Sequence, residues 1–502
     1  AAALRAEIVP LIQEAQQAGR KAIAAGFAES PFDARAMTSS YTYLTDQLLR
    51  CVLQIATQVL HPNPNPTEGE RLAMIGVGGY GRGEMAPFSD VDLLFLIPYK
   101  ATAWSESVIE SMLYILWDLK LKVGHATRTI EDCLRLGADD YTIQTALLEN
   151  RFIDGDLTLA QELSERLKND LFSGAGKDFI EAKLEERDNR HLKQGERYMV
   201  EPNVKEGKGG LRDLHSLFWI AKFIHDVDRV ADLVDLGVFR ADEYDTFREA
   251  EAFLWAVRGH LHLIAGRATE QLTFDMQVQV AQAMGYQDIG GRRGVEIFMQ
   301  AYFRHATAVG DLTRIFVSGL EASHMKAEPL LERIFRRRPK MREGFQVVHN
   351  RIALKDEQEF LKDKLNLLRI FEEALRTGML IHPDAMRLIK ANLALIDDDM
   401  RRTPEARRIF LDLLLKHGNP ERSLRRMNEL GVLGAFIPEF EPIVAMMQFN
   451  MYHSYTVDEH TIQCIANLAR IEKGELEEEL PVASSILKRG VNRKVLYVAL
   501  LL

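Results

Sequence analysis

The sequence predicts an α+β protein, in which a small mixed sheet carries polar groups and helices occupy most of the remaining chain. Three observations predict this class. Two apolar runs, 72–77 and 91–97, enclose a glycine-rich loop and are typical of buried strands. A third run, 121–128, also has the pattern of a strand. Elsewhere apolar residues recur at spacings of three and four, which is the period of an amphipathic helix.

The elements around the sheet follow in order along the chain. Helices are expected over 4–28 and 34–60, packed beside the sheet. The Pro-rich segment 61–66 breaks the helical pattern before the first strand. A helix over 105–119 leads to the third strand, and residues 139–196 are expected to be helical.

The second half of the chain is predicted to be mostly helical. A helix is expected over 211–223, followed by long helices over 241–320 and mainly helical structure over 344–440. The strongly basic segment 333–342 is interpreted as a solvated face or a protein-docking patch.

Composition excludes several classes of protein. The net charge of −10 argues against a non-specific nucleic-acid binder. Cys51, Cys133 and Cys464 are far apart and odd in number, which favours a reducing cytoplasm over a disulfide framework or a thiolate zinc site. No apolar run reaches about 18 residues, and the charged segment 1–29 does not resemble a signal peptide. We therefore expect a cytoplasmic protein with no nucleic-acid or membrane partner.

An acidic pair begins the second predicted strand. Because side chains alternate faces along a strand, Asp90 and Asp92 are expected to point to the same side. Two ionised carboxylates at this spacing repel each other and need a cation, for which Mg²⁺ with a bound triphosphate is suitable. Asp90 and Asp92 are therefore predicted to be catalytic metal ligands.

The loop before this pair is suited to phosphate. Gly78 and Gly79 lack a Cβ, so the backbone can approach a phosphate and donate N–H groups to it. Arg82 and Ser89 are further predicted donors to phosphate oxygens. Two other interpretations are a dinucleotide-binding G-x-G-x-x-G fingerprint beginning at Gly76 and a solvated acidic turn. Pro87 and the early position of the acidic pair argue against the fingerprint.

The string GGYGRGEMAPFSDVDLL, residues 78–94, carries a family resemblance. Its glycine pair and Asp-x-Asp resemble the DNA polymerase β-like nucleotidyltransferase superfamily. The full string is similar to the bacterial PII uridylyltransferase/uridylyl-removing enzymes (GlnD). The resemblance implies transfer of UMP from UTP to a tyrosine of the PII signal protein, with Mg²⁺ or Mn²⁺ at the transferase site. It also implies removal of UMP by a separate HD-type hydrolase domain.

A second glycine-rich stretch, 201–214, precedes the helix expected from Leu211. Backbone N–H groups at the start of that helix, together with Lys205, Lys208 and Arg212, predict an anion site. The family shares the pattern K-x-G-x-G-G-L-R-D, and the resemblance implies that this stretch closes over the nucleotide. Lys205 and Arg212 are expected to contact the triphosphate. The alternative is a surface loop that caps a helix.

A third metal-binding carboxylate, which the superfamily usually takes from a later strand, is not identified. Gly124 and His125 occupy the middle of the third predicted strand, and a packed or surface role is expected for His125. Four candidates lie elsewhere in this region: Asp118, Asp139, Asp140 and, less favoured, Glu149.

The segment 451–462 resembles the opening of the HD domain of the same family. His460 matches the first ligand of its divalent metal site, which also needs a later His-Asp pair and a last Asp. The chain stops at Leu502 before those ligands, so we expect little or no metal at His460 and no uridylyl-removing activity. Domains that sense glutamine in the family are also expected to be absent. The dipeptide His225-Asp226 is interpreted as a helix end, not a hydrolase site.

Together, these features predict a polymerase β-like nucleotidyltransferase sheet domain followed by helical domains, the last an incomplete HD domain. The expected bounds are N-terminal helices at 1–66, a nucleotidyltransferase domain at 67–200, an associated helical domain at 201–330, a helical connecting region at 331–440 and the start of an HD domain at 441–502. The predicted activity is uridylylation of PII. Alternatives are an adenylyltransferase acting on glutamine synthetase, which the HD-like segment disfavours, and an inactive nucleotide-binding module, which the intact acidic pair disfavours.

Overall fold

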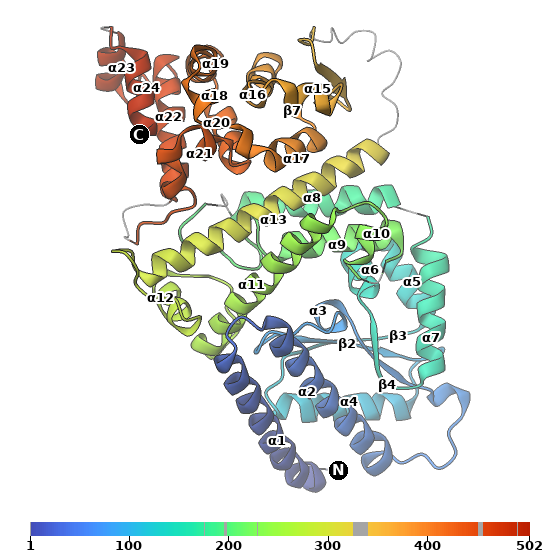
Figure 1. Cartoon of the computed structure of the whole chain (residues 1–502). Coiled ribbons are helices and arrows are strands. Elements are labelled where there is room, and N and C mark those ends of the chain that lie inside the picture. Colours follow the sequence, from blue (N-terminus) through green and yellow to red (C-terminus); the bar gives the residue numbers. More distant parts are fainter. Residues whose placement is uncertain are drawn as a thin grey trace. The chain divides into compact units, whose positions relative to one another are not determined.

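A computed structural model describes residues 2–174, 176–194, 198–227, 229–324, 340–449, 455–488 and 490–502. Most of the basic segment 333–342 and the first residues of the HD-like segment 451–462 lie outside these ranges. The chain forms two compact units (Figure 1). The first unit contains residues 1–195 and 203–287, and the second contains 196–202 and 288–502. The mixed α+β class is confirmed, and the predicted bounds of five domains stay a prediction.

A four-stranded mixed sheet is at the centre of the first unit. Its strands are β1 (Ala73–Gly76), β2 (Val91–Leu96), β3 (Val123–Arg128) and β4 (Arg151–Gly155), in the order β3-β2-β1-β4. β1 is antiparallel to β2 and β4, whereas β2 and β3 are parallel. A parallel pair needs a crossover connection, which α4 (Ala103–Asp118) supplies.

The strand β4 is a correction, because residues 139–196 were expected to be helical throughout. Its segment, RFIDG, has only five residues and lies directly between two helices. A strand this short has too little alternation to stand out from the helical pattern around it. The other helices of the unit lie largely within the expected helical ranges, except α3, α5 and α10, for which no helix was expected. They are α1 (Ala2–Glu29), α2 (Ala34–Gln54) with a π-helical end at Ile55–Leu60, α3 (Gly78–Gly81), α5 (Ile130–Asp139), α6 (Tyr141–Leu148), α7 (Leu157–Arg166), α8 (Gly176–Gln194), α9 (Leu211–His225), α10 (Asp232–Asp235), α11 (Ala241–Ala265) and α12 (Phe274–Ala283).

Apolar side chains cover both faces of the sheet. On one face, Leu94 and Leu96 of β2 belong to a buried cluster with residues of α5, α6 and α7. On the other, Leu93 and Phe95 are buried, and α2 and α4 lie beside the sheet (Figure 1). Asp92 shares the face of Leu94 but lies at the end of β2, where the apolar cover stops. The fold therefore leaves one polar corner open on an otherwise buried sheet.

The second unit is mostly helical, with a small three-stranded sheet. The helices are α13 (Gly294–His324), α15 (Glu357–Lys362), α16 (Asn366–Thr377), α17 (Pro383–Ala391), α18 (Asp398–Arg402), α19 (Pro404–Leu415), α20 (Pro420–Glu429), α21 (Val432–Phe436), α22 (Val457–Glu472), α23 (Pro481–Lys488) and α24 (Arg493–Leu501). The sheet, in the order β5-β6-β7, joins β5 (Phe345–Val348), β6 (Arg351–Leu354) and β7 (Leu380–Ile381). Sequence patterns did not predict these short strands.

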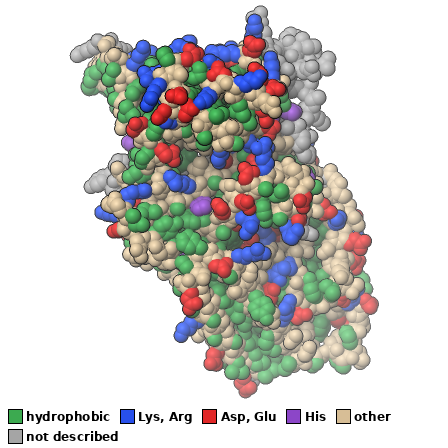
Figure 2. Space-filling view, viewed as in Figure 1, with side chains coloured by type: hydrophobic (Ala, Val, Ile, Leu, Met, Phe, Trp, Pro, Cys, Tyr) green, Lys and Arg blue, Asp and Glu red, His purple; other side chains and the backbone are tan. Residues whose placement is uncertain are grey.

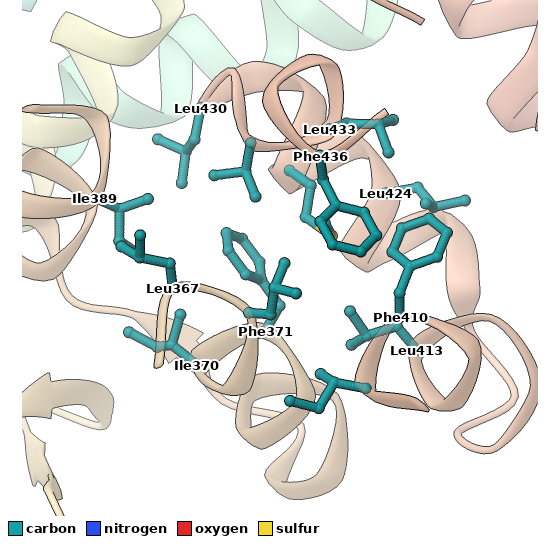
Figure 3. Close-up of a cluster of buried hydrophobic side chains, with 14 of the residues drawn as sticks. Leu367, Ile370, Phe371, Ile389, Phe410, Leu413, Leu424, Leu430, Leu433 and Phe436 are labelled. Atoms are coloured by element: carbon teal, nitrogen blue, oxygen red, sulfur yellow. The ribbon is translucent and has the colours of Figure 1, made fainter. Parts of the chain in front are cut away.

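One apolar core holds this second unit together. Figure 3 shows side chains of its central helices converging on one another, among them Leu367, Ile370, Phe371, Ile389, Phe410, Leu413, Leu424, Leu433 and Phe436. The rings of Phe410 and Phe436 lie 5.0 Å apart between centroids. The same core includes Ile462 of α22 and Tyr497 of α24, so it continues through the HD-like segment.

The surface is charged but mixed in sign. Figure 2 shows Lys and Arg interspersed with Asp and Glu on the visible face. Within the described ranges, every helix is too short or too polar to span a bilayer.

Candidate active site

A cleft in the first unit brings together the sequence-predicted residues of its transferase site. The cleft has a volume of about 330 Å³. Eight of its lining residues were predicted: Gly78, Gly79, Arg82, Ser89, Asp90, Asp92, Lys205 and Arg212. The first and second glycine-rich stretches, more than a hundred residues apart in the sequence, therefore contribute to a single site.

The acidic pair occupies the open corner of the sheet. Asp90 and Asp92 are exposed, whereas Val91 and Leu93 are buried, as strand alternation requires. The backbone of Asp92 is fixed by a 3.0 Å hydrogen bond from the N–H of Val77. Partial burial, and then the neighbouring charge of Asp90, raise the pKa of Asp92, while Lys205 opposes this shift. The charge of Lys205 does not fully offset burial and the charge of Asp90, and hard carboxylate oxygens fit Mg²⁺ or Mn²⁺ at this corner.

The turn that follows β1 requires glycine at two positions. Gly78 has a φ of +60°, in the left-handed region where side chains are disfavoured, and begins the short helix α3. A Cβ on Gly81 would lie only 1.7 Å from the carbonyl oxygen of Glu149, so this turn packs directly on the end of α6. The first N–H groups of such a turn have no partner within it and are available to an anion.

Gly124 makes room for the carboxylate of Asp92. It is the register partner of Asp92 on the neighbouring strand β3. A Cβ at this position would lie 2.5 Å from Asp92 Oδ1. From the sequence alone, Gly124 was notable only because it supplies no third carboxylate. The structure shows that the missing side chain of Gly124 leaves space for the carboxylate of Asp92. His125 pairs with Leu93 and so faces away from Asp92, outside the residues that line the cleft.

Arg82 lines the cleft but is already paired with carboxylates. Its guanidinium donates at 3.0 Å to Glu84 and at 2.9 Å to Glu149, whose side chain is buried. Burial raises the pKa of Glu149, although the charge of Arg82 opposes this. Phosphate contact by Arg82 stays a prediction, but these partners give it a clear role in fixing the glycine turn against α6.

Ser89 keeps a donor available for a ligand. Its Oγ accepts a 3.0 Å hydrogen bond from the N–H of Ala86, which fixes the side chain in the turn before Asp90. An accepting hydroxyl still has its own hydrogen to donate. The geometry is therefore compatible with the predicted phosphate contact.

The second glycine-rich stretch is held rigidly by its own backbone and by Asp213. Side chains cannot be accommodated at Gly207 and Gly210, where a Cβ would lie 2.4 Å from the Asn203 oxygen and 2.6 Å from the Val204 oxygen. Buried Asp213 accepts from the N–H of Gly209 at 2.8 Å and bonds to His191. These contacts orient the predicted helix, observed as α9, at the wall of the cleft.

Lys205 faces the cleft from this stretch and Arg212 from the start of α9. Burial, followed by repulsion from Arg258 and Arg212, lowers the pKa of Lys205. The Arg212 guanidinium contacts Glu206 at 3.1 Å and lies 5.3 Å from the Trp219 ring centre. Lys208, the third predicted cation, is outside the residues that line the cleft.

Arg258 and Glu270 form an ion pair close enough to Lys205 to affect its pKa, and no sequence pattern predicted this pair. Arg258 contacts Glu270 at 2.8 Å, and His262 Nε2 lies 3.6 Å from the same carboxylate. His262 Nδ1 accepts from the N–H of Phe88, so Nε2 is assigned the proton. Burial opposes the charge of Glu270, but His262 and Arg258 outweigh it and hold its pKa at about 2.

Of the four candidates for a third metal-binding carboxylate, only Glu149 lines the cleft. Asp118 pairs with Arg5 and Asp140 caps α6, and neither these two nor Asp139 lines the cleft. Glu149 does line it, but one of its oxygens is taken by Arg82. Three further acids of the cleft were not anticipated: Glu84, which lies within the first glycine-rich stretch, and Glu186 and Glu270, which only the fold brings there.

Two histidine motifs lie outside the cleft, one at His460 and one at His225-Asp226. His460 is exposed on α22, with Cys464 Sγ 3.7 Å from its Nε2. No cluster of three metal-binding side chains was found among the described residues. Asp226 ends α9 in a left-handed conformation and pairs with Lys168, which agrees with a helix-end role for His225-Asp226.

Comparisons with known proteins show which proteins this chain is similar to. The family model described as GlnD PII-uridylyltransferase matches residues 178–317, and the model of the uridylyltransferase GlnD third domain matches residues 345–436. Bifunctional uridylyltransferase/uridylyl-removing enzymes are 71% identical in Ruegeria pomeroyi, 62% in Cereibacter sphaeroides and 45% in Azospirillum brasilense. These alignments cover 99–100% of this chain and 54–55% of the relatives.

The mixed sheet, the glycine turn and the acidic corner have the arrangement that is expected of a nucleotidyltransferase domain. Among nucleotidyltransferases, the chain belongs to the GlnD family of bacterial PII uridylyltransferase/uridylyl-removing enzymes. It spans about half the length of the curated relatives it matches.

Proposed function

We propose that this chain transfers UMP from UTP to a tyrosine of the PII nitrogen-regulatory protein. The main support is the convergence of Asp90, Asp92, the glycine turn and Lys205 in one cleft. A relative named for uridylyl transfer and removal is 71% identical over the whole of this chain. The proposal assigns the cleft to UTP and leaves its mouth to the acceptor tyrosine.

Each group of the cleft has a distinct part in this reaction. The N–H groups at Gly78 and Gly79 and the Ser89 hydroxyl bind the β- and γ-phosphates, and Lys205 and Arg212 add positive charge to the same phosphates. Asp90 and Asp92 hold the divalent ion. Mg²⁺ or Mn²⁺, when bound there, supplies positive charge that favours attack at the α-phosphate and departure of pyrophosphate.

The positions of these groups favour in-line transfer. Donors fixed by the turn and by α9 hold the triphosphate, so that the tyrosine oxygen and the leaving oxygen can lie on opposite sides of the α-phosphorus. The oxygen–phosphorus bond to tyrosine forms as the bond to pyrophosphate breaks. The tyrosine proton leaves to solvent or to a carboxylate of the cleft.

A labelling comparison tests this function. The chain is incubated with Mg²⁺, radiolabelled UTP or ATP, and either PII or glutamine synthetase. The proposal expects label from UTP on a PII tyrosine. Label from ATP on glutamine synthetase would instead support an adenylyltransferase, and binding of UTP without transfer would support a regulatory module.

The remaining parts of the family resemblance are also proposed here. Residues 441–502 are assigned to the beginning of the HD hydrolase domain, with His460 as a ligand to its divalent metal in the longer relatives. Glutamine is assigned as an effector acting through domains beyond these residues. A cytoplasmic location is consistent with a PII substrate and with three free cysteines.

A further inference from the structure

A second cavity adjoins the catalytic cleft within the first unit. It has a volume of about 620 Å³ and lies among α2, α9 and α11. Five residues line both hollows and form a shared wall: Arg82, Glu84, Glu149, His215 and Trp255. Apolar and aromatic side chains such as Phe218 and Phe247 also line it. We call this space the basic cavity, because of the charges described next.

Three cations from three different helices face the basic cavity without a carboxylate partner. They are Arg35 of α2, Lys222 of α9 and Arg248 of α11. Among the described residues, none of the three forms an ion pair, whereas Arg82 and Arg151 are paired with Glu149 and Asp46. Glu149 attracts Lys222 without forming an ion pair, and Glu251 attracts Arg35 and Arg248 only when it is ionised, so an anion bound among the three cations would stabilise them.

Buried hydrogen-bond donors in the wall also lack acceptors. His215 and Trp255 are 5% and 4% exposed, and neither His215 Nδ1 nor Trp255 Nε1 has a partner. Burial, then the charge of Arg82, lowers the pKa of His215 well below its usual value, so the ring is neutral. Its Nε2 lies 3.5 Å from the Arg82 guanidinium, which assigns the hydrogen to Nδ1. Unsatisfied buried donors are costly, and a ligand with acceptor oxygens would satisfy them.

The unpaired acid of the cavity does not cancel this positive charge. Burial, followed by repulsion from Glu84, raises the pKa of Glu251 to about 8. At neutral pH Glu251 is therefore mostly protonated and can itself donate a hydrogen bond. The cavity combines unpaired cations, free donors and aromatic surface.

We propose that the basic cavity binds a small organic dianion, a carboxylate or a phosphate ester with an apolar body, at a site distinct from the catalytic cleft. The cations of three helices hold the charged groups, and the aromatic side chains contact the apolar body. The shared wall contains the Arg82–Glu149 pair, which fixes the glycine turn of the cleft. A ligand in the cavity would therefore lie against the pair that fixes the catalytic turn.

Calorimetric titration of the metal-free chain with succinate and with phenyl phosphate tests this site. The two probes separate a dicarboxylate from an aromatic phosphate ester, and saturable one-to-one binding of either supports the proposal. Arg248→Gln and Lys222→Gln should each weaken binding about tenfold, because each removes one charge-assisted contact. Glu251→Gln should leave binding as tight or tighter. No UTP or acceptor is present, so the result is independent of the proposed transferase activity.

Two matched variants locate the ligand. Arg135→Gln removes an exposed arginine of α5 that lines neither hollow, and Lys205→Gln removes a cation of the cleft. Both should bind the probe as the unmodified chain does. The proposal fails if neither probe saturates, if Arg248→Gln and Lys222→Gln bind normally, or if Lys205→Gln is the variant that loses binding. Thermal unfolding checks each variant, and Arg35→Gln replaces any that does not fold.

Discussion

Asp90 and Asp92 lie at the corner of a covered sheet, whereas His460 lies on the exposed side of a helix in the other unit. Both were predicted to bind metal from short motifs. Around the aspartates, the fold adds a glycine turn, a serine hydroxyl and two cations from a distant stretch of the chain. Around His460, the described residues supply a cysteine but no cluster of three metal-binding side chains.

This difference teaches that a motif becomes a site through what the fold places beside it. Burial and the charge of Asp90 both raise the pKa of Asp92, and a bound cation would favour its ionised form, so the acidic pair gains from a cation. An exposed imidazole outside such a cluster gains little from one ion. Four changes test this contrast, from the largest expected effect to the smallest.

Asp92→Asn should cause the largest loss. It removes one of the two charges of the acidic corner while keeping the shape of the side chain. We expect a fall of about 10³-fold in kcat for UMP transfer, as for loss of a principal electrostatic contact in an active site. The measurement is steady-state labelling of PII. Asp139→Asn, at an exposed aspartate outside the cleft, is the matched control and should stay fully active.

Glu270→Gln should reduce stability in a pH-dependent way. The folded pKa is about 2, whereas an unfolded glutamate titrates near ~4.3. A lowered pKa stabilises the fold above the unfolded value, and this contribution is lost as the pH falls toward the folded value. The side chain is one-fifth exposed, and the contribution at pH 6 is up to about 3 kcal/mol. Urea unfolding of both proteins should show a difference that shrinks between pH 6 and pH 3. A difference that does not change with pH would contradict the assigned ion pairs.

Gly124→Ala tests whether space beside Asp92 matters. The new Cβ would lie 2.5 Å from Asp92 Oδ1 and force the carboxylate to move. A displacement of this kind should lower kcat/KM by about tenfold or more. Gly26→Ala is the control, because a Cβ there meets no atom within 4 Å. Equal activities in the two variants would show that the carboxylate tolerates the shift.

His460→Ala should have the smallest effect. Because His460 belongs to no cluster of three metal-binding side chains among the described residues, its removal should leave the number of bound Mn²⁺ ions unchanged. Equilibrium dialysis gives this number directly. Loss of one ion per chain would show that α22 carries a metal site after all.

Sequence reasoning predicted the parts of the fold that depend on local pattern. The strands β1, β2 and β3 and the helix α9 lie within two residues of their expected bounds. The strand β4 and the sheet of β5, β6 and β7 were missed, because runs of two to five residues carry too little alternation.

The parts of the site that lie within one short motif were predictable from the sequence. The acidic pair and the glycine turn needed only strand alternation and the absence of a Cβ. The pairing of Arg82 with Glu149 spans 67 residues and arises because α6 ends against the turn. Likewise, Glu270 reaches the cleft only because Val204 pairs with its backbone oxygen at 2.8 Å. Contacts of this kind depend on tertiary structure, and no local sequence pattern predicts them.

The central claim is that the carboxylates of Asp90 and Asp92 together hold a divalent ion with the triphosphate. Its most direct test is a Mn²⁺ titration followed by electron paramagnetic resonance, with and without UTP. The unmodified chain should bind Mn²⁺ more tightly when UTP is present, and the double variant Asp90→Asn/Asp92→Asn should lose at least about tenfold in that affinity while remaining folded. Unchanged UTP-dependent binding in the double variant would contradict the account.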